Sequence, residues 1–109
     1  MNAMNTTKEM NCCLTLACHR SMEDRLVGHL LEHPEWIFGF IMNKAEGGSQ
    51  KEKLPSMIEQ VRGRSQRAAF QAVMNLEDAR ALVAHLKLEE GNPEIAYWIT
   101  PVIEFGRLA

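Results

Sequence analysis

Residues 11–19 read NCCLTLACH, and this short apolar stretch begins the pattern that decides the fold. Its alternate residues place apolar side chains on one face of an extended chain, which is typical of a strand. Ser21 stands three residues before the carboxylate of Asp24, a spacing that favours the start of a helix. Apolar residues then recur at helical spacing until Pro34, so we expect the helix to end near His33.

The strand, helix and strand pattern occurs twice in the chain. Residues 36–42 read WIFGFIM and predict the second strand, because aromatic and β-branched residues favour strands. Residues 68–74 predict a third strand, and residues 94–105 predict a fourth that is interrupted at Pro101. Between them, Asn75 caps a helix that ends at Gly91. Two such units in one sheet predict an α+β fold of ferredoxin-like βαββαβ order, with a four-stranded antiparallel sheet and both helices on one face.

Composition limits the class of protein. The 109 residues are 46% hydrophobic and 24% charged, which is ordinary for one globular domain, here expected over residues 10–109 after a flexible leader at 1–9. A net charge of −2 argues against a general nucleic-acid-binding surface. We expect no membrane span, because no apolar run approaches the roughly 20 residues that one requires. The three cysteines lie close together at 12–18 without a second cluster to pair with, which favours a cytoplasmic protein.

A long basic segment separates the two units. The apolar periodicity lapses at about residues 43–67, and six of the twelve Lys and Arg residues occur there. We expect a loop, with a short helical turn at about 56–61 as an option.

The second and fourth predicted strands, 36–42 and 94–105, are apolar on both sides. A sheet with one wet face would alternate apolar and polar residues instead. We therefore expect the sheet face away from the helices to be buried against other subunits.

The order of these elements, with a long loop between strands two and three, resembles the PII family of nitrogen regulatory proteins and its bacterial PII-like relatives. Residues 47–51, GGSQK, look like the Gly-x-Gly-x-Gln-Lys segment that opens the PII T-loop. Residues 95–102, IAYWITPV, followed by Glu104 and Arg107, look like the last PII strand. The cation-tolerance CutA proteins are similar in fold and in this strand. The resemblance covers about residues 11–107.

What the PII resemblance implies is a non-enzymatic signalling or regulatory homotrimer with its sheets facing the centre. Nucleotides or other small anionic effectors would bind between subunits, and the 43–67 loop, in the place of the T-loop, would engage a regulated protein partner. The sequence departs from the PII pattern after the second helix, where residues 87–93 carry two carboxylates that would repel phosphate. It also lacks a tyrosine in the loop.

An anion site at the base of the loop is the first candidate site. Glycines let backbone amides approach a ligand, and arginine forks suit phosphate or carboxylate. The candidate ligand-binding residues are Gly47, Gly48, Gln50, Lys51, Arg62, Arg64, Arg67 and Arg107, and the candidate partner-binding residues are Lys44, Lys51, Lys53 and Met57. The plain alternative is that these are solvated loop charges.

A divalent metal site is the second candidate. His29 and His33 are four residues apart on the first helix and could face the same way, which would suit a metal-binding trimer of the CutA type. Catalysis is not expected. Cys18 and His19 are adjacent in a strand and point to opposite faces, so they cannot form a nucleophile and base pair.

Overall fold

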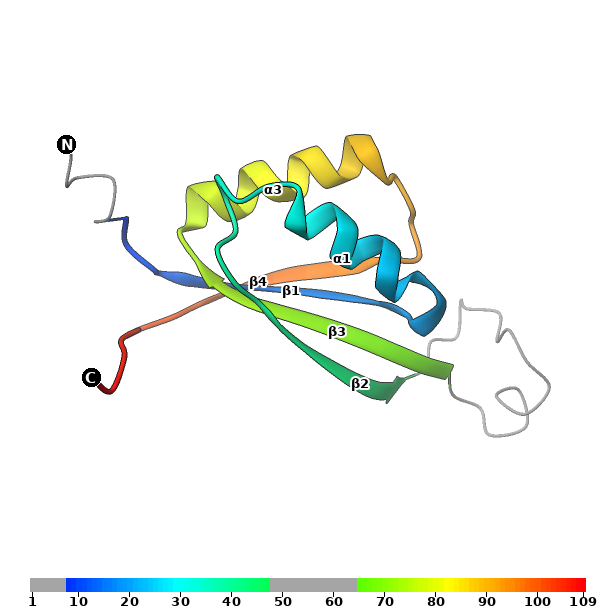
Figure 1. The fold of residues 1–109 in the computed structure, drawn as a ribbon, viewed down its shortest axis with the longest axis horizontal. Helices are drawn as coiled ribbons and strands as arrows, with labels where there is room; N and C mark the ends of the chain where they lie inside the picture. The colour runs from blue at the N-terminus through cyan, green and yellow to red at the C-terminus, as the bar shows by residue number, and fades with distance from the viewer. Residues whose placement is uncertain (1–7, 48–64) are drawn as a thin grey trace.

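The computed structural model describes residues 8–47 and 65–109. Its elements in chain order are β1 (Cys12–His19), the 3-10 turn η2 (Arg20–Met22), α1 (Glu23–Leu31), β2 (Ile41–Gly47), β3 (Ser65–Met74), α3 (Leu76–Glu89) and β4 (Ala96–Pro101). Figure 1 shows the sheet as one layer and the two helices as the other. The ferredoxin-like order predicted from the sequence is confirmed.

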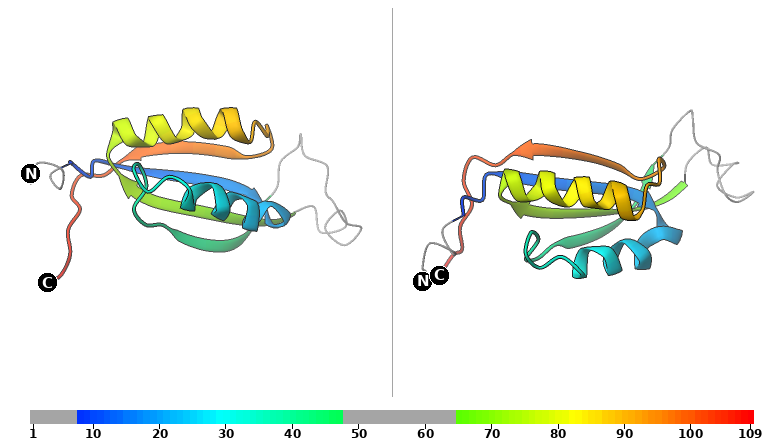
Figure 2. Two further views of the ribbon diagram at one scale, coloured as in Figure 1. Left: turned by 45° about the horizontal axis from the view of Figure 1, so that its top comes forward. Right: turned by 90° about the horizontal axis from the view of Figure 1, so that it is seen from above.

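The sheet has the strand order β2-β3-β1-β4, and every neighbouring pair is antiparallel. The central strand β1 pairs with β3 and β4, whereas β2 and β4 are the edges. Figure 2 shows α1 and α3 side by side on one face, with α3 nearer β4 and α1 nearer β2. The opposite face, which we call the open face, carries no element of the described chain.

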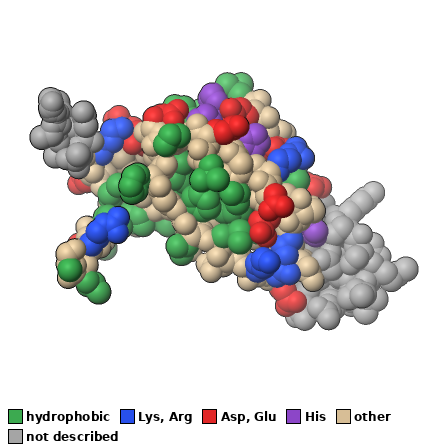
Figure 3. All heavy atoms as spheres, in the orientation of Figure 1, with side chains coloured by type: hydrophobic (Ala, Val, Ile, Leu, Met, Phe, Trp, Pro, Cys, Tyr) green, Lys and Arg blue, Asp and Glu red, His purple; other side chains and the backbone are tan. Residues whose placement is uncertain are grey.

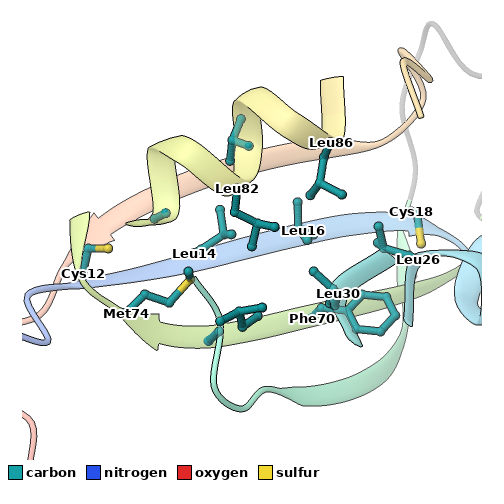
Figure 4. Packing of buried hydrophobic residues seen from close by; sticks show 14 of the residues in the cluster. Cys12, Leu14, Leu16, Cys18, Leu26, Leu30, Phe70, Met74, Leu82 and Leu86 are labelled. Atoms are coloured by element: carbon teal, nitrogen blue, oxygen red, sulfur yellow. The ribbon is translucent and has the colours of Figure 1, made fainter. Parts of the chain in front are cut away.

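The core fills the space between the sheet and the helices, as Figure 4 shows. The residues that point into it from alternate positions of β1 and β3 are Cys12, Leu14, Leu16, Cys18, Ala68, Phe70, Ala72 and Met74. Leu26 and Leu30 of α1 and Leu82 and Leu86 of α3 close over them, all buried. Each large side chain so buried contributes about 1.5–3 kcal/mol, so this layer is the main source of stability.

Both ends of α3 follow the sequence signals. The Asn75 side chain accepts a hydrogen bond from the Glu77 amide at 3.0 Å, which caps the first turn. At the other end Gly91 has a φ of +59°, a conformation in which an L side chain is strained. The amides of Glu90 and Gly91 both donate to the Leu86 carbonyl, at 2.8 and 3.3 Å, and the helix stops.

The second strand is not where the sequence pattern predicted it. It runs over Ile41–Gly47 rather than 36–42. The amides of Trp36 and Ile37 both donate to the His33 carbonyl at 3.1 Å, which folds this stretch into turns. Ile37 is buried in the core, and Phe40 packs edge-on against Phe70 at 6.0 Å. The apolar residues of 36–40 therefore cover the core from a loop.

Strand β2 itself is polar and exposed, so the expectation of a second strand apolar on both sides is wrong. An edge strand has one neighbour, and charged side chains on it discourage unwanted pairing. Lys44 and Glu46 are exposed there. The segment predicted as a loop at 43–67 begins and ends as strand, in β2 and at 65–67 of β3. The option of a helical turn at 56–61 lies outside the described residues.

The two ends of the described chain show further features. Strand β4 ends at Pro101 rather than 105, and beyond it Ile103 and Leu108 are fully exposed. Within the leader expected at 1–9, Lys8 pairs with Asp78 at 3.0 Å. Among the described residues no helix is both long and apolar enough to cross a membrane.

The core predicts a sharp contrast between two leucines of α3. Leu82 is fully buried, whereas Leu88 is 86% exposed on the same helix. We expect Leu82→Ala to lower the free energy of unfolding by about 2–5 kcal/mol, because it removes transfer energy and leaves a cavity. Leu88→Ala should change it by less than about 0.5 kcal/mol. Urea unfolding at one protein concentration measures both, and equal effects would contradict this packing.

Candidate functional site

The base of the loop is built from the last rungs of β2 and β3. Gly47 pairs with Ser65, and Ala45 pairs with Arg67. The Arg67 side chain lies against Gly47, since a Cβ added there would sit 3.3 Å from Arg67 Cγ and 3.7 Å from its Nε. Gly47 therefore leaves room for the arginine stem. Of the predicted ligand residues, these two are brought together.

Arg20 joins this base, and the sequence reasoning missed it. Its Nη1 donates to Gln66 Oε1 at 3.0 Å, while its Nε is buried without a hydrogen-bond partner among the described residues. His19 lies opposite Arg67 on the neighbouring strand. The signal was available: Arg20 directly follows the first strand, and antiparallel pairing puts the end of that strand beside the start of the third.

The remaining predicted residues are scattered or not described. Gly48, Gln50, Lys51, Arg62 and Arg64, with the partner-binding Lys53 and Met57, lie outside the described residues. Lys44 is exposed on β2, opposite Ala68.

Arg107 lies beyond the far end of the sheet. β4 ends at Pro101 opposite Cys12, whereas Arg67 is opposite His19. These rungs are seven residues apart on β1, or about 23 Å. Figure 1 shows the tail and the loop ends at opposite ends of the molecule. Within one chain Arg107 therefore does not meet the loop base.

A pocket of about 310 Å³ opens where α3 turns into β4. It lies on the helical side of the sheet, at the same end as the loop base, because Ala96 pairs with Ala17 near the end of β1. Its walls are mainly apolar and include Leu16, Leu26, Leu86 and Ile95. Lys87 Nζ lies 5.4 Å from the centre of the Tyr97 ring at its rim.

The acidic end of α3 is engaged by basic side chains. Arg25 holds the Glu90 carboxylate with two donors, Nε at 3.1 Å and Nη2 at 2.5 Å. His29 Nε2 lies 3.0 Å from the same carboxylate. Burial raises the pKa of Glu90, but its hydrogen bonds with His29 and Arg25 outweigh burial and lower it. Arg25 and His29 thus compensate the Glu90 charge that the sequence suggested would repel phosphate.

Glu89 is the centre of a histidine cluster on the helical layer. His85 Nε2 lies 2.8 Å from Glu89 Oε2, and His33 Nε2 lies 3.3 Å from Oε1. His29 Nδ1 approaches the same oxygen at 3.4 Å. Figure 3 shows histidine and acidic side chains side by side on this surface. The predicted metal pair, His29 and His33, is therefore brought to one carboxylate.

Two members of the cluster were missed from the sequence. His85 and Glu89 are four residues apart on α3 and so share a face, a spacing that was visible in the chain. His33 is buried, and its Nδ1 lies 3.4 Å from Glu35 Oε2. Trp36 stacks on the His33 ring at 5.2 Å and meets the His85 ring edge-on at 5.5 Å.

These contacts shift the ionisation of the cluster. Burial alone lowers the pKa of His33, but hydrogen bonds and charge from Glu89 and Glu35 outweigh it and raise the pKa above its ordinary 6.5. Burial likewise raises the pKa of Glu89, and its bonds with His33 and His85 outweigh that and lower it below 4.5. The metal-free cluster therefore favours protonated His33 beside ionised Glu89.

The stability of the metal-free protein should depend on pH through His33. Because the pKa of His33 is higher folded than unfolded, its stabilising contribution is full below about pH 6.5 and is lost as the pH rises through the folded-state pKa. Histidine ring NMR in chelated buffer should place the pKa of His33 above 6.5. Glu89→Gln should lower it, since it removes the charged partner.

Glu77→Gln is the matched control, because Glu77 lies on the same helix about 18 Å from Glu89 along its axis. It should leave the His33 titration unchanged. A His33 titration insensitive to Glu89→Gln would show that this contact does not form in solution.

Several proteins of known structure share this fold. No curated protein matches the sequence significantly. A crystal structure of a DUF3240 family protein from Shewanella baltica OS155 has a TM-score of 0.72 at 23% identity, covering 93% of this chain and 99% of that chain. CPII, a nitrogen regulatory PII-like protein from Thiomonas intermedia K12 bound to ADP, AMP and bicarbonate, has a TM-score of 0.65 at 12% identity, covering 91% and 96%.

CutA from Synechococcus elongatus PCC7942, complexed with Bis-Tris, has a TM-score of 0.63 at 11% identity and covers 88% of this chain and 84% of that chain. At these identities the likeness is one of fold, and at that level the resemblance to PII-like and CutA proteins is confirmed. The sequence itself matches the family described as "Protein of unknown function (DUF3240)" over residues 8–109. The chain therefore belongs to the DUF3240 family.

Proposed function

We propose that this chain is a PII-like signalling or regulatory protein. It forms a homotrimer, binds a small anionic effector such as a nucleotide of the ADP or AMP class between subunits, and engages a partner protein through the 43–67 segment. The observation that carries the proposal is the loop base, where Arg67 packs against Gly47 at the point from which that segment leaves the sheet, and Arg20 donates to Gln66 on the adjacent rung.

The loop base suits an anion for physical reasons. Arginine forks form charge-assisted hydrogen bonds with phosphate or carboxylate, and such bonds are about twice as strong as neutral ones. The Arg20 side chain is held by the bond from its Nη1 to Gln66 Oε1 at 3.0 Å, and its Nε is buried. An effector bound here would contact both arms of the 43–67 segment, so it could alter the fit of that segment to a partner.

The open face supports assembly. The strand register places on it Cys13, Thr15, Ala17, Ile41, Asn43, Ala69, Gln71, Val73, Ala96, Trp98 and Thr100. At the loop end of this face, His19, Arg67 and Ala45 share one rung. Between the His19 rung and the Cys12 rung, none of the described strand residues that point to the open face carries a charge. Ile41 is 61% exposed and Trp98 is 48% exposed. A surface so poor in charge is typical of one that is covered.

The tail after β4 gives a second reason for subunit contacts. Ile103, Phe105 and Leu108 are exposed in an extended stretch that leaves the sheet. Packing against another subunit would bury them and would offer the only route by which Arg107 reaches a loop base. Both features fit the trimer and the intersubunit effector site that we propose.

Assembly is tested by a charge placed on the open face, midway along the edge strand β4. Light scattering of the wild type should give three times the chain mass of 12.4 kDa. Trp98→Glu should give monomers at micromolar concentration, because burying an unpaired carboxylate is costly. Leu88→Glu adds the same charge on exposed α3 and should keep the wild-type mass. A monomeric wild type would contradict the trimer.

Effector binding is tested at Arg67. Calorimetry with ADP, AMP and bicarbonate should show saturable binding to the wild type of at least one of them. Arg67→Ala should weaken that binding tenfold or more, since a charged hydrogen bond contributes about 1.5–3 kcal/mol. Arg80→Ala is the control, as Arg80 is exposed in the first half of α3. Binding that is equal in both variants, or absent throughout, would refute the effector site.

A metal-binding trimer of the CutA type is the second candidate function. The specific observation in its favour is the histidine cluster around Glu89, which lies on the helical layer and has no role in the effector proposal. The two candidates do not exclude each other, because the cluster and the open face are on opposite sides of the sheet.

A further inference from the structure

The cluster around Glu89 combines borderline nitrogen donors with one carboxylate. The ligand atoms of His33, His85 and Glu89 all lie within 4.8 Å of one another. Tetrahedral bonds of about 2.0 Å would bring donors to about 3.3 Å from each other. The separations from Glu89 oxygens to His85 Nε2 and His33 Nε2 are 2.8 and 3.3 Å, so little movement is needed.

Surrounding residues hold the three donors in place. His33 is buried, and the carbonyl of the same residue anchors the turn that carries Trp36. Glu35 lies 3.4 Å from His33 Nδ1, on the ring nitrogen that faces away from Glu89. A carboxylate in that position fixes the ring and raises the basicity of the other nitrogen. The Trp36 ring contacts both imidazoles and limits their rotation.

His29 is better explained by another contact. Its Nε2 lies 3.0 Å from Glu90, which Arg25 also holds. His29, Glu32 and Glu89 form a second group of suitable spacing, but it offers only one imidazole. Both groups share Glu89, so they compete for it. Imidazole nitrogen suits zinc, copper and nickel better than carboxylate oxygen does. The group with two histidines is therefore the better site for such a metal.

We propose that His33, His85 and Glu89 bind one divalent transition metal ion of the zinc class, with Glu35 as the positioning residue for His33. Three protein ligands leave a fourth position for water or an exchangeable ligand, as in open rather than structural zinc sites. His85 is 38% exposed in its side chain, so the ion can enter from solvent. The site deepens the second candidate function, and it does not depend on the anionic effector.

The test uses the full chain in metal-free buffer. Titration of Zn²⁺ against a chelating dye should show one ion bound per chain. His85→Ala and Glu89→Gln should each weaken binding at least tenfold, and Glu35→Gln should weaken it about 10–100-fold. His29→Ala is the matched control and should stay within about twofold of the wild type. Circular dichroism without metal checks that every variant is folded.

Cobalt distinguishes this site from the cysteines. Cys12, Cys13 and Cys18 are free thiols, and a thiolate ligand would give an intense charge-transfer band with Co²⁺. We expect a spectrum of nitrogen and oxygen ligation without that band, lost in His85→Ala. A thiolate band, or the absence of saturable binding of zinc, cobalt, nickel and copper, would overturn the proposal.

The outcomes also separate this site from the function that it deepens. Metal binding that survives His85→Ala and Glu89→Gln but is lost in His29→Ala would refute this ligand set, while a metal-binding function would stand. Failure of ADP, AMP and bicarbonate to bind would refute the effector proposal and leave the metal site intact.

Discussion

The rest of the structure depends on the burial of one face of the central strand β1. Leu14 and Leu16 are almost inaccessible to solvent under the two helices, and β1 is the strand that joins the edge strand β4 to β3. Because side chains alternate along a strand, fixing this face also fixes what points the other way. A slip of one residue would turn every core side chain of β1 outward, so the register is strongly specified.

This one-sided core determines where function can be placed. Both helices, which carry the histidine cluster, lie on one face of the sheet, and the opposite face is the one that we propose other subunits cover. Thr15 illustrates the second point: it is buried on the open face between its cross-strand neighbours Gln71 and Trp98. The loop base lies at one end of the sheet, adjoining the open face, because Arg67 pairs with His19 there.

The sequence was informative wherever local rules and burial agree. The alternation in β1, the Asn75 cap and the Gly91 stop predicted their elements closely. It failed at 36–40, where apolar residues cover the core from a turn, because strand propensity cannot distinguish a strand from a loop that buries the same side chains. The cluster was half predicted. His29 lies on α1 and His33 follows just beyond its end, so their spacing indicated that they could meet. Their contact with His85 and Glu89 depends on how α1 and α3 pack together, which local spacing does not indicate.

The acidic end of α3 explains how this chain can keep the PII-like fold and yet depart from the PII pattern. At this end Glu89 and Glu90 turn toward His29, His33 and Arg25. Both carboxylates are therefore already paired with basic side chains of the helical layer. In the functions that we propose, an anion is held at the loop base and a cation at the end of α3. Glu89, one of the two carboxylates that would repel phosphate, is also the carboxylate of the metal site that we propose.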